Sequence, residues 1–463
     1  MVWRDDTIAA IATAIGEGGI GVIRISGEKA PDILKSVFIL KSGMEPESFE
    51  NRKMVYGFII DKENGGRIID EVLVVSMAAP NTYTCENVVE IQCHGSVVSV
   101  RKILELVLRK GAAPAYPGEF TQRAFLNGRL DLSQAEAVID LIKAKSEKSF
   151  ELAVSQLEGG LSRRVREIRK KIEDLLVQVI VNLDFPDEDI EEIEYGKLIE
   201  SLSLIYDRLE RLKSSSDTGR VIREGLKVAI IGKPNVGKSS LMNALLHETR
   251  AIVTEIPGTT RDTIEELLTI GEVPVVLTDT AGIRETDDTI EKLGIEKSKI
   301  SSNKADMIIF IIDASRSLSI EDYEIAEYVK ERKAIVLLNK TDLEEKVTTA
   351  DIENLVPGAQ IIRVSLKIGS GLEVLESTIR EMVFGGDVAP GDDEIISNVR
   401  HKDLLFKAAS SISNALDSAK AHEALDFAEF DIRHAWDSLG EITGESVSED
   451  IIDEVFSRFC LCK

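Results

Sequence analysis

The stretch Gly232-Lys233-Pro234-Asn235-Val236-Gly237-Lys238-Ser239 decides the fold of the central part of this chain. It matches the GxxxxGKS/T pattern of a phosphate-binding loop, and it lies between an apolar run and a helix-like segment, as that loop requires. Glycines let backbone N–H groups turn toward phosphate oxygens, Lys238 reaches the β and γ phosphates, and the Ser239 hydroxyl binds Mg²⁺. The sequence therefore predicts a site for a nucleoside triphosphate.

Later motifs indicate that the base is guanine. Asp279-Thr280-Ala281-Gly282 ends a second apolar run and supplies a carboxylate for the magnesium shell. Asn339-Lys340-Thr341-Asp342 ends a third, and the Asp342 carboxylate can accept from both guanine N1–H and N2–H₂, a donor pair that adenine lacks. Ser365-Leu366-Lys367 comes where small GTPases place their last base-contacting loop. These motifs predict GTP contacts from Gly232, Val236, Gly237, Lys238, Ser239, Ser240, Asp279, Thr280, Gly282, Asn339, Lys340, Asp342, Ser365 and Lys367.

The residue after Gly282 is Ile283, where a glutamine would orient the attacking water in the commonest small-GTPase pattern. Isoleucine cannot do this. The residues leave several replacements open: an arginine finger from a partner, a bound cation, or a carboxylate further along, among them Asp287, Asp288 and Glu291. A slow switch that depends on an external activator is equally compatible with the motif.

Composition restricts the class of protein. At 463 residues the chain exceeds one ordinary core, and 43% hydrophobic with 30% charged residues describes a globular protein of two or three domains. A net charge of −25 disfavours non-specific binding to RNA or anionic membranes, so an RNA contact needs a local patch or a basic partner. No secretory signal or membrane span is expected, and Cys85, Cys93, Cys460 and Cys462 do not suggest a disulfide framework, which favours a reducing cytoplasm.

Periodicity predicts the elements. Residues 20–25, 55–61 and 71–77 are typical of strands, and Asn64-Gly65-Gly66 predicts a hairpin between two of them. Beyond residue 127 the pattern is helical, with a capping box predicted at Ser133 and Glu136. Long helices are expected over 146–184 and 195–214.

The order of these elements predicts a multidomain α+β and α/β chain. We expect an N-terminal α+β domain over 1–126, the first half of a discontinuous helical bundle over 127–222, an inserted Ras-like doubly wound GTPase domain over 223–385, and the second half of the bundle over 392–463. Residues 214–219 and 385–391 are interpreted as the linkers on either side of the insertion. The basic stretch 163–171 fits a solvated helix face better than an RNA site.

Over essentially its whole length the chain resembles the MnmE (TrmE) family of tRNA-modification GTPases. The matching segments are Asp6-Thr7-Ile8, residues 18–27 (GGIGVIRISG), Pro117-Gly118-Glu119-Phe120, residues 126–129 (LNGR), residues 131–137 (DLSQAEA), residues 258–262 (GTTRD), residues 440–445 (GEITGE) and Phe459-Cys460.

The resemblance implies a folate-binding N-terminal domain, similar to tetrahydrofolate-binding aminomethyltransferases, that also forms a homodimer. It further implies a hetero-complex with the FAD- and NADH-using MnmG (GidA). Together such proteins install a (carboxymethyl)aminomethyl group at C5 of the wobble uridine of certain tRNAs, with the carbon from methylene- or formyl-tetrahydrofolate. The alternative is a GTP-dependent switch, such as a ribosome-assembly GTPase, with no chemistry beyond hydrolysis.

For hydrolysis the resemblance implies that paired GTPase domains hold K⁺, which replaces the arginine finger. Asn235, Thr254, Ile256 and Thr259 would contact K⁺, Ser239 and Thr260 would hold Mg²⁺, and Glu291 would orient the attacking water through a bridging water. Asn235, Thr254, Thr259 and Thr260 thereby join the predicted GTP site.

For the one-carbon site the resemblance implies folate contacts from Arg24, Glu90, Arg129 and Lys463, and a catalytic thiol at Cys460. The chain departs from the family at its end, where Cys460-Leu461-Cys462-Lys463 replaces the usual Cys-Ile/Leu-Gly-Lys. A side chain therefore stands where glycine is usual, beside the proposed thiol. Cys85 likewise precedes Glu86 at a position where glycine is common.

Overall fold

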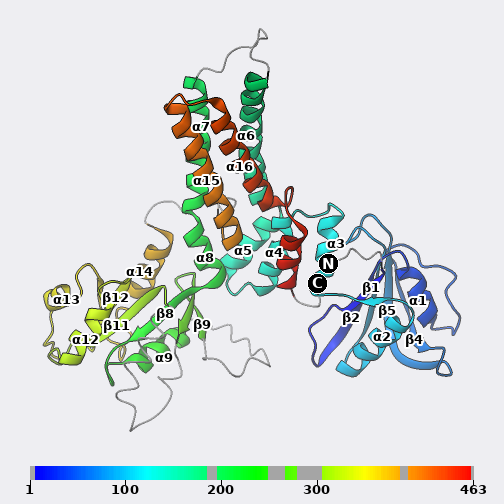
Figure 1. Ribbon diagram of the computed structural model, residues 1–463. Coiled ribbons are helices and arrows are strands. Elements are labelled where there is room, and N and C mark those ends of the chain that lie inside the picture. Colours follow the sequence, from blue (N-terminus) through cyan, green and yellow to red (C-terminus); the bar gives the residue numbers. More distant parts are fainter. Residues whose placement is uncertain (1–5, 185–194, 249–265, 279–304, 386–394, 460–463) are drawn as a thin grey trace. The chain divides into compact units, whose positions relative to one another are not determined.

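The computed structural model describes residues 6–184, 195–248, 266–278, 305–385 and 395–459 of the chain (Figure 1). These form two compact units. The first unit comprises residues 1–142, 156–205 and 410–463, and the second comprises 143–155 and 206–409. The predicted division into four segments stays a prediction.

A seven-stranded sheet forms the centre of the first unit, with strand order β3-β4-β5-β6-β2-β1-β7. Its strands are β1 (Ile8–Ile11), β2 (Gly18–Ser26), β3 (Phe38–Leu40), β4 (Met54–Asp61), β5 (Arg67–Met77), β6 (Val88–Gly95) and β7 (Ala113–Pro114). All neighbours are antiparallel except β1 and β7. The three predicted strands and the hairpin between β4 and β5 are confirmed.

Two helices, α1 (Ala30–Val37) and α2 (Val97–Arg109), cover one face of this sheet. Ile23, Ile25, Val89 and Ile91 point into the shared apolar core with the two helices. Because side chains alternate along a strand, Arg24 and Glu90 project from the opposite face. The strand pattern therefore places these two polar side chains together, away from the core.

The remaining helices of the first unit are α3 (Glu119–Leu126), α4 (Leu132–Lys143), α6 (Gly160–Asp184), α16 (Leu425–Thr443) and α17 (Glu449–Ser457), while α5 (Glu147–Leu157), α7 (Tyr195–Ser214) and α15 (Val399–Lys420) run across the boundary between the units. The prediction of one helix over 146–184 is wrong. The chain turns at Gly159, which has φ +83°, and this separates α5 from α6.

The predicted capping box at Ser133 and Glu136 is also wrong. Asp131 and Gln134 form it instead: Gln134 N donates to Asp131 Oδ1 at 3.0 Å, and Asp131 N donates to Gln134 Oε1 at 3.0 Å. Ser133 Oγ lies 2.9 Å from Asp131 Oδ1 and 2.8 Å from Ser162 Oγ. The sequence contains two overlapping capping patterns, and the earlier one begins the helix.

A six-stranded sheet forms the centre of the second unit, with strand order β13-β12-β11-β8-β10-β9. Its strands are β8 (Leu226–Ile231), β9 (Glu266–Ile270), β10 (Val273–Thr278), β11 (Met307–Asp313), β12 (Ala334–Asn339) and β13 (Gln360–Arg363). All are parallel except β9, which lies antiparallel at one edge. β8 lies between β10 and β11, where the strand order reverses and ligands bind in such sheets.

Helices cover both faces of this sheet (Figure 1). One apolar core includes α8 (Ser216–Glu224), α9 (Lys238–Glu248) and α14 (Leu372–Phe384), and the other includes α12 (Ile320–Val329) and α13 (Thr349–Leu355). This confirms the doubly wound α/β prediction. The linker predicted over 214–219 is wrong, because residues 216–219 form the first turn of α8.

No helix in the described ranges has both the length and the apolar content that a bilayer crossing requires.

Candidate functional site

The predicted phosphate loop connects β8 to α9 at the carboxyl edge of the second sheet. Gly232 has φ +151°, and a Cβ there would lie 2.5 Å from Ile311 O. Gly237 has φ +113°, and a Cβ there would lie 2.3 Å from Asn339 Nδ2. Both positions therefore need glycine, for backbone conformation and for space. The two glycines thus let the loop pack tightly against β11 and Asn339.

Lys238 projects its ammonium group over the loop. Lys238 Nζ donates to Gly232 O at 2.8 Å and to Lys233 O at 2.7 Å. Burial lowers the pKa of Lys238. Ser239 and Ser240 follow on the exposed first turn of α9. Positive charge and a helix N-terminus thus meet at one place, which suits phosphate groups.

Asn339 connects the phosphate loop to the loop after β13. Asn339 Nδ2 donates to Val236 O at 2.7 Å, and Asn339 Oδ1 accepts from Leu366 N at 3.2 Å. Asn339 itself is buried. Its amide therefore holds together two segments that the sequence assigned to phosphate and to base.

Lys340 lies on the same edge and contacts a carboxylate that sequence reasoning missed. Lys340 Nζ donates to Asn235 O at 3.0 Å and to Asp313 Oδ2 at 2.6 Å. Burial by itself would raise the pKa of Asp313, but hydrogen bonds from Lys340 and Ser315 outweigh it and the pKa is lowered. The signal was present, since Asp313 ends the apolar run of β11 as Asn339 ends that of β12.

Asp342 is exposed, and its Oδ1 accepts from Ser365 Oγ at 2.7 Å. Ser365 is fully buried, whereas Lys367 is exposed. The serine therefore orients the carboxylate that is predicted to read guanine. The structure brings Gly232, Asn235, Val236, Gly237, Lys238, Asn339, Lys340, Asp342 and Ser365 to one edge of the sheet.

Other predicted residues lie outside the described ranges. These are Thr254, Ile256, Thr259, Thr260, Asp279, Thr280, Gly282, Glu291, Cys460 and Lys463. Within the described ranges, no three histidine, cysteine or acidic side chains gather as a metal site.

Two of the predicted folate residues form an ion pair in the first unit. Arg24 and Glu90 are register partners on β2 and β6, and Arg24 donates to Glu90 Oε1 from Nε at 2.9 Å and from Nη2 at 2.7 Å. The Arg24 guanidinium also lies 5.6 Å from the centroid of the Tyr83 ring and 5.8 Å from that of Phe120. This places it in range for cation–π attraction.

Arg129 reaches Tyr83 as well and lines a cavity. Its guanidinium lies 4.7 Å from the ring centroid, and Nη1 donates to Tyr83 O at 3.3 Å. The cavity has a volume of about 500 Å³ and is lined by Arg52, Met77, Pro80, Asn81, Thr82, Tyr83, Cys85, Asn127, Gly128 and Arg129. Its volume lies within the range of small-molecule sites, and Arg52 and Arg129 give its lining positive charge. Sequence reasoning missed Tyr83 and Arg52.

A buried polar network holds the loop that carries Tyr83 and Cys85. Ser26 Oγ lies 2.7 Å from Thr84 Oγ1 and donates to Glu86 Oε2 at 2.7 Å. Arg123 Nη1 donates to both oxygens of Glu86 at 3.1 Å. The cavity wall is therefore preorganised by side chains from β2 and α3.

Phe459, the residue before Cys460, is buried in an apolar cluster with α3, α4 and α17. A Cβ at Gly118, which has φ +72°, would lie 2.8 Å from Phe459 Cβ. The described end of the chain is thus fixed against the beginning of α3.

Comparison with known proteins identifies the family of the chain. Residues 132–460 match the family model for the MnmE helical domain, and residues 7–129 match that for the GTP-binding protein TrmE N-terminus. The chain is 51% identical over 462 residues to the tRNA modification GTPase MnmE of Alkaliphilus metalliredigens, with 100% of both chains covered. The protein of the same name from Clostridioides difficile is 50% identical over 459 residues, with 99% of both covered. The chain belongs to the MnmE (TrmE) family of tRNA modification GTPases.

Proposed function

We propose that this chain, a GTP-hydrolysing enzyme of tRNA modification, binds GTP at the edge formed by the loops after β8, β11, β12 and β13. Its turnover would drive the installation of a (carboxymethyl)aminomethyl group at C5 of the wobble uridine. The convergence of the phosphate loop, Asn339, Lys340 and the Asp342–Ser365 pair supports the proposed GTP site. In this cytoplasmic reaction a homodimer would act with an FAD-dependent partner that carries the tRNA.

Each residue has a distinct role in this proposal. Lys238 and the N–H groups of the loop would bind the phosphates, and Asp342 would accept from the guanine edge. Mg²⁺, held by Ser239 and Thr260, would supply charge neutralisation at the β and γ phosphates. Glu291 would orient the attacking water.

K⁺ would supply the positive charge that an arginine finger gives elsewhere. Asn235 lies within the phosphate loop and is exposed, so its side chain is accessible to a site that a second copy would complete. Thr254, Ile256 and Thr259 would provide the remaining oxygen ligands.

Tetrahydrofolate would occupy the first unit. Arg24, Glu90, Arg129 and Lys463 are its proposed contacts, and the cavity with Arg129 and Tyr83 in its wall supports this location. Glu90 carries the counter-charge of Arg24. In this proposal the pair would offer N–H and oxygen groups to a pterin. Cys460 would assist the carbon transfer as a thiolate.

Measurement of GTP hydrolysis tests the proposed K⁺-dependent mechanism. We expect steady-state hydrolysis by the purified chain in K⁺ to exceed that in Na⁺ by at least about tenfold, because the wrong cation leaves transition-state charge unstabilised. Asn235→Ala should remove the difference. Equal rates in both salts, with Asn235→Ala active, would exclude the cation mechanism.

Folate binding tests the second site. Arg129→Met should weaken 5-formyltetrahydrofolate binding by roughly tenfold or more, since a charge-assisted hydrogen bond contributes about 1.5–3 kcal/mol. Calorimetry measures the affinity. Arg109→Met is the matched control, because Arg109 pairs with Asp61 at 2.7 Å and does not line the cavity. GTP hydrolysis should be unchanged in both variants.

The alternative, a switch without further chemistry, makes a different prediction. Wobble nucleosides measured by mass spectrometry in cells lacking the chain should lose the aminomethyl-type modification if the proposal is correct. Their persistence would favour the switch.

A further inference from the structure

We propose that Lys233 and Asp322 form a positioning pair that fixes the first turn of the phosphate loop against α12, and so sets nucleotide affinity. Lys233 Nζ lies 2.6 Å from Asp322 Oδ2 and donates to Ser319 Oγ at 2.9 Å. Neither Lys233 nor Asp322 belongs to the motif positions that define the loop. The inference rests on the proposed assignment of residues 232–239 to the phosphates.

Asp322 is a buried carboxylate with two tasks. Its side chain is 1% exposed, and its Oδ2 accepts from Ser319 N at 2.8 Å and from Ser319 Oγ at 3.2 Å, which caps α12. Its Oδ1 has no hydrogen-bond partner within the described part of the chain. A buried carboxylate is costly unless a cation compensates it, and Lys233 lies in position to do so.

Lys233 connects this carboxylate to the phosphate lysine. Its side chain reaches α12, while its own carbonyl oxygen accepts from Lys238 Nζ at 2.7 Å. Displacement of Lys233 would therefore move one of the two carbonyl groups that hold Lys238. Small displacements of binding groups cost affinity because the interaction geometry is narrow.

A second capping box in the same unit provides a matched control. At the start of α13, Asp351 Oδ2 accepts from Thr348 N at 2.8 Å and from Thr348 Oγ1 at 2.7 Å. Asp351 occupies the same N3 position in α13 as Asp322 does in α12. Unlike Asp322, it is exposed and does not pair with a residue of the phosphate loop. Substitution of Asp351 therefore measures the effect of losing a helix cap on nucleotide affinity, without any change at the phosphate loop.

The test uses the full chain, a fluorescent GTP analogue for affinity, and steady-state GTP hydrolysis. We expect Asp322→Asn and Lys233→Met each to weaken nucleotide affinity by at least about tenfold, with the loss in KM rather than kcat, because the pair shapes the loop in ground and transition states alike. The double variant should be no worse than either single one. Lys233→Arg should restore affinity, and Asp351→Asn should stay within about twofold of the unaltered chain.

Two results would contradict the proposed positioning role of Lys233 and Asp322. One is an affinity of Asp322→Asn and Lys233→Met equal to that of Asp351→Asn, and the other is independent, additive losses in the double variant. If Asp322→Asn does not fold, as judged by circular dichroism, the proposal is tested by Lys233→Met and Lys233→Arg alone. Equal nucleotide affinities of these two variants would then contradict it. Lys238→Ala tests the underlying assignment separately: unchanged nucleotide binding there would remove the phosphate site itself, not only its support.

Discussion

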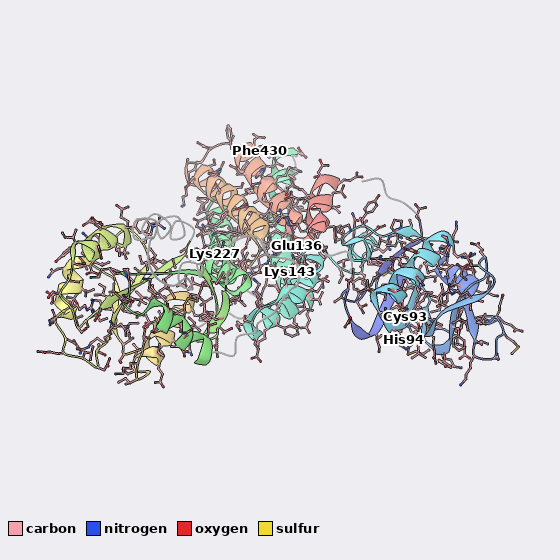
Figure 2. The ribbon with its side chains drawn as sticks, turned by 90° about the horizontal axis from the view of Figure 1, so that it is seen from below. Cys93, His94, Glu136, Lys143, Lys227 and Phe430 are labelled. Carbon is pink, nitrogen blue, oxygen red and sulfur yellow. The ribbon has the colours of Figure 1, made fainter. Side chains whose placement is uncertain are left out.

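Asp70 contacts polar groups of His94 and Ser99 in the first unit. It accepts from Ser99 Oγ and from His94 N at 3.1 Å, and its Oδ1 lies 2.6 Å from His94 Nδ1. Burial by itself would raise the pKa of Asp70, but these hydrogen bonds outweigh it and the pKa is lowered. The neighbouring Cys93, also on β6 (Figure 2), faces the core, where burial raises its pKa to about 11.

The contact with Asp70 makes the contribution of His94 to the stability of the fold depend on pH. The hydrogen bond to Asp70, and then its charge, raise the pKa of His94. Because the folded pKa is the higher one, the pair stabilises the fold fully below the unfolded pKa of about 6.5, and this contribution is lost as pH rises through the folded pKa. Asp70→Asn should lower the pKa of His94, measured by NMR titration of the ring signals. An identical titration in both proteins would show that Asp70 does not control it.

At the scale of elements, α8 depends on a glycine. A Cβ at Gly219 would lie 2.1 Å from Ile396 O and 2.6 Å from its carbonyl carbon. Ser215, just before α8, accepts from Ile396 N through its Oγ at 3.1 Å. The segment at residue 396 therefore packs directly on the backbone of the helix.

Gly219→Ala should destabilise the second unit even though alanine is the better helix former. The gain of about 1 kcal/mol in propensity is outweighed by overlap with rigid backbone, which costs about 1–3 kcal/mol and more where the backbone must shift. Hydrogen exchange of α8 should accelerate. Gly196→Ala in α7 is the control, because a Cβ there has no neighbour within 4 Å, and it should be neutral or stabilising. Equal behaviour of the two variants would contradict the packing argument.

At the scale of the whole molecule, negative charge dominates. The basic residues 163–171 of α6 do not form a free positive patch, because several of them contact other groups of the chain. Arg166 pairs with Asp131 at 2.9 Å, Lys170 with Asp174 at 2.9 Å, and Arg169 lies 3.8 Å from the ring centroid of Trp436. Arg163, Arg164, Arg166, Lys170 and Lys171 are exposed, as expected for the predicted solvated helix face. With a net charge of −25, the chain repels RNA, so we expect RNA binding to need a basic partner.

The chain alone should therefore bind tRNA no more tightly than the 10⁻⁴–10⁻⁶ M that is roughly typical of non-specific contacts at physiological salt. Addition of the proposed FAD-dependent partner should produce tight binding. Fluorescence anisotropy with labelled tRNA, at several salt concentrations, measures both. Submicromolar binding by the chain alone, with a steep salt dependence, would place an RNA site on this molecule.

Local patterns account for what sequence reasoning predicted well. The phosphate loop needs its glycines within eight residues, and the strands at 20–25 and 55–61 show the alternation that one buried face imposes. The errors arose where two local signals competed, as at Asp131 and Ser133, or where a glycine served packing, as at Gly219. Tyr83 was missed because its partners Arg24 and Arg129 are distant in sequence, whereas Asp313 was missed although it ends the apolar run of β11.

The sequence by itself determined the nucleotide class, the doubly wound sheet and the family, because each follows from short motifs whose own residues lie close together in the chain. Only the tertiary structure decided that Arg24 meets Glu90, that Arg129 and Tyr83 line one cavity, and that Lys233 reaches Asp322 on α12. Strand register and helix packing create such contacts, and both depend on the burial of side chains from distant segments.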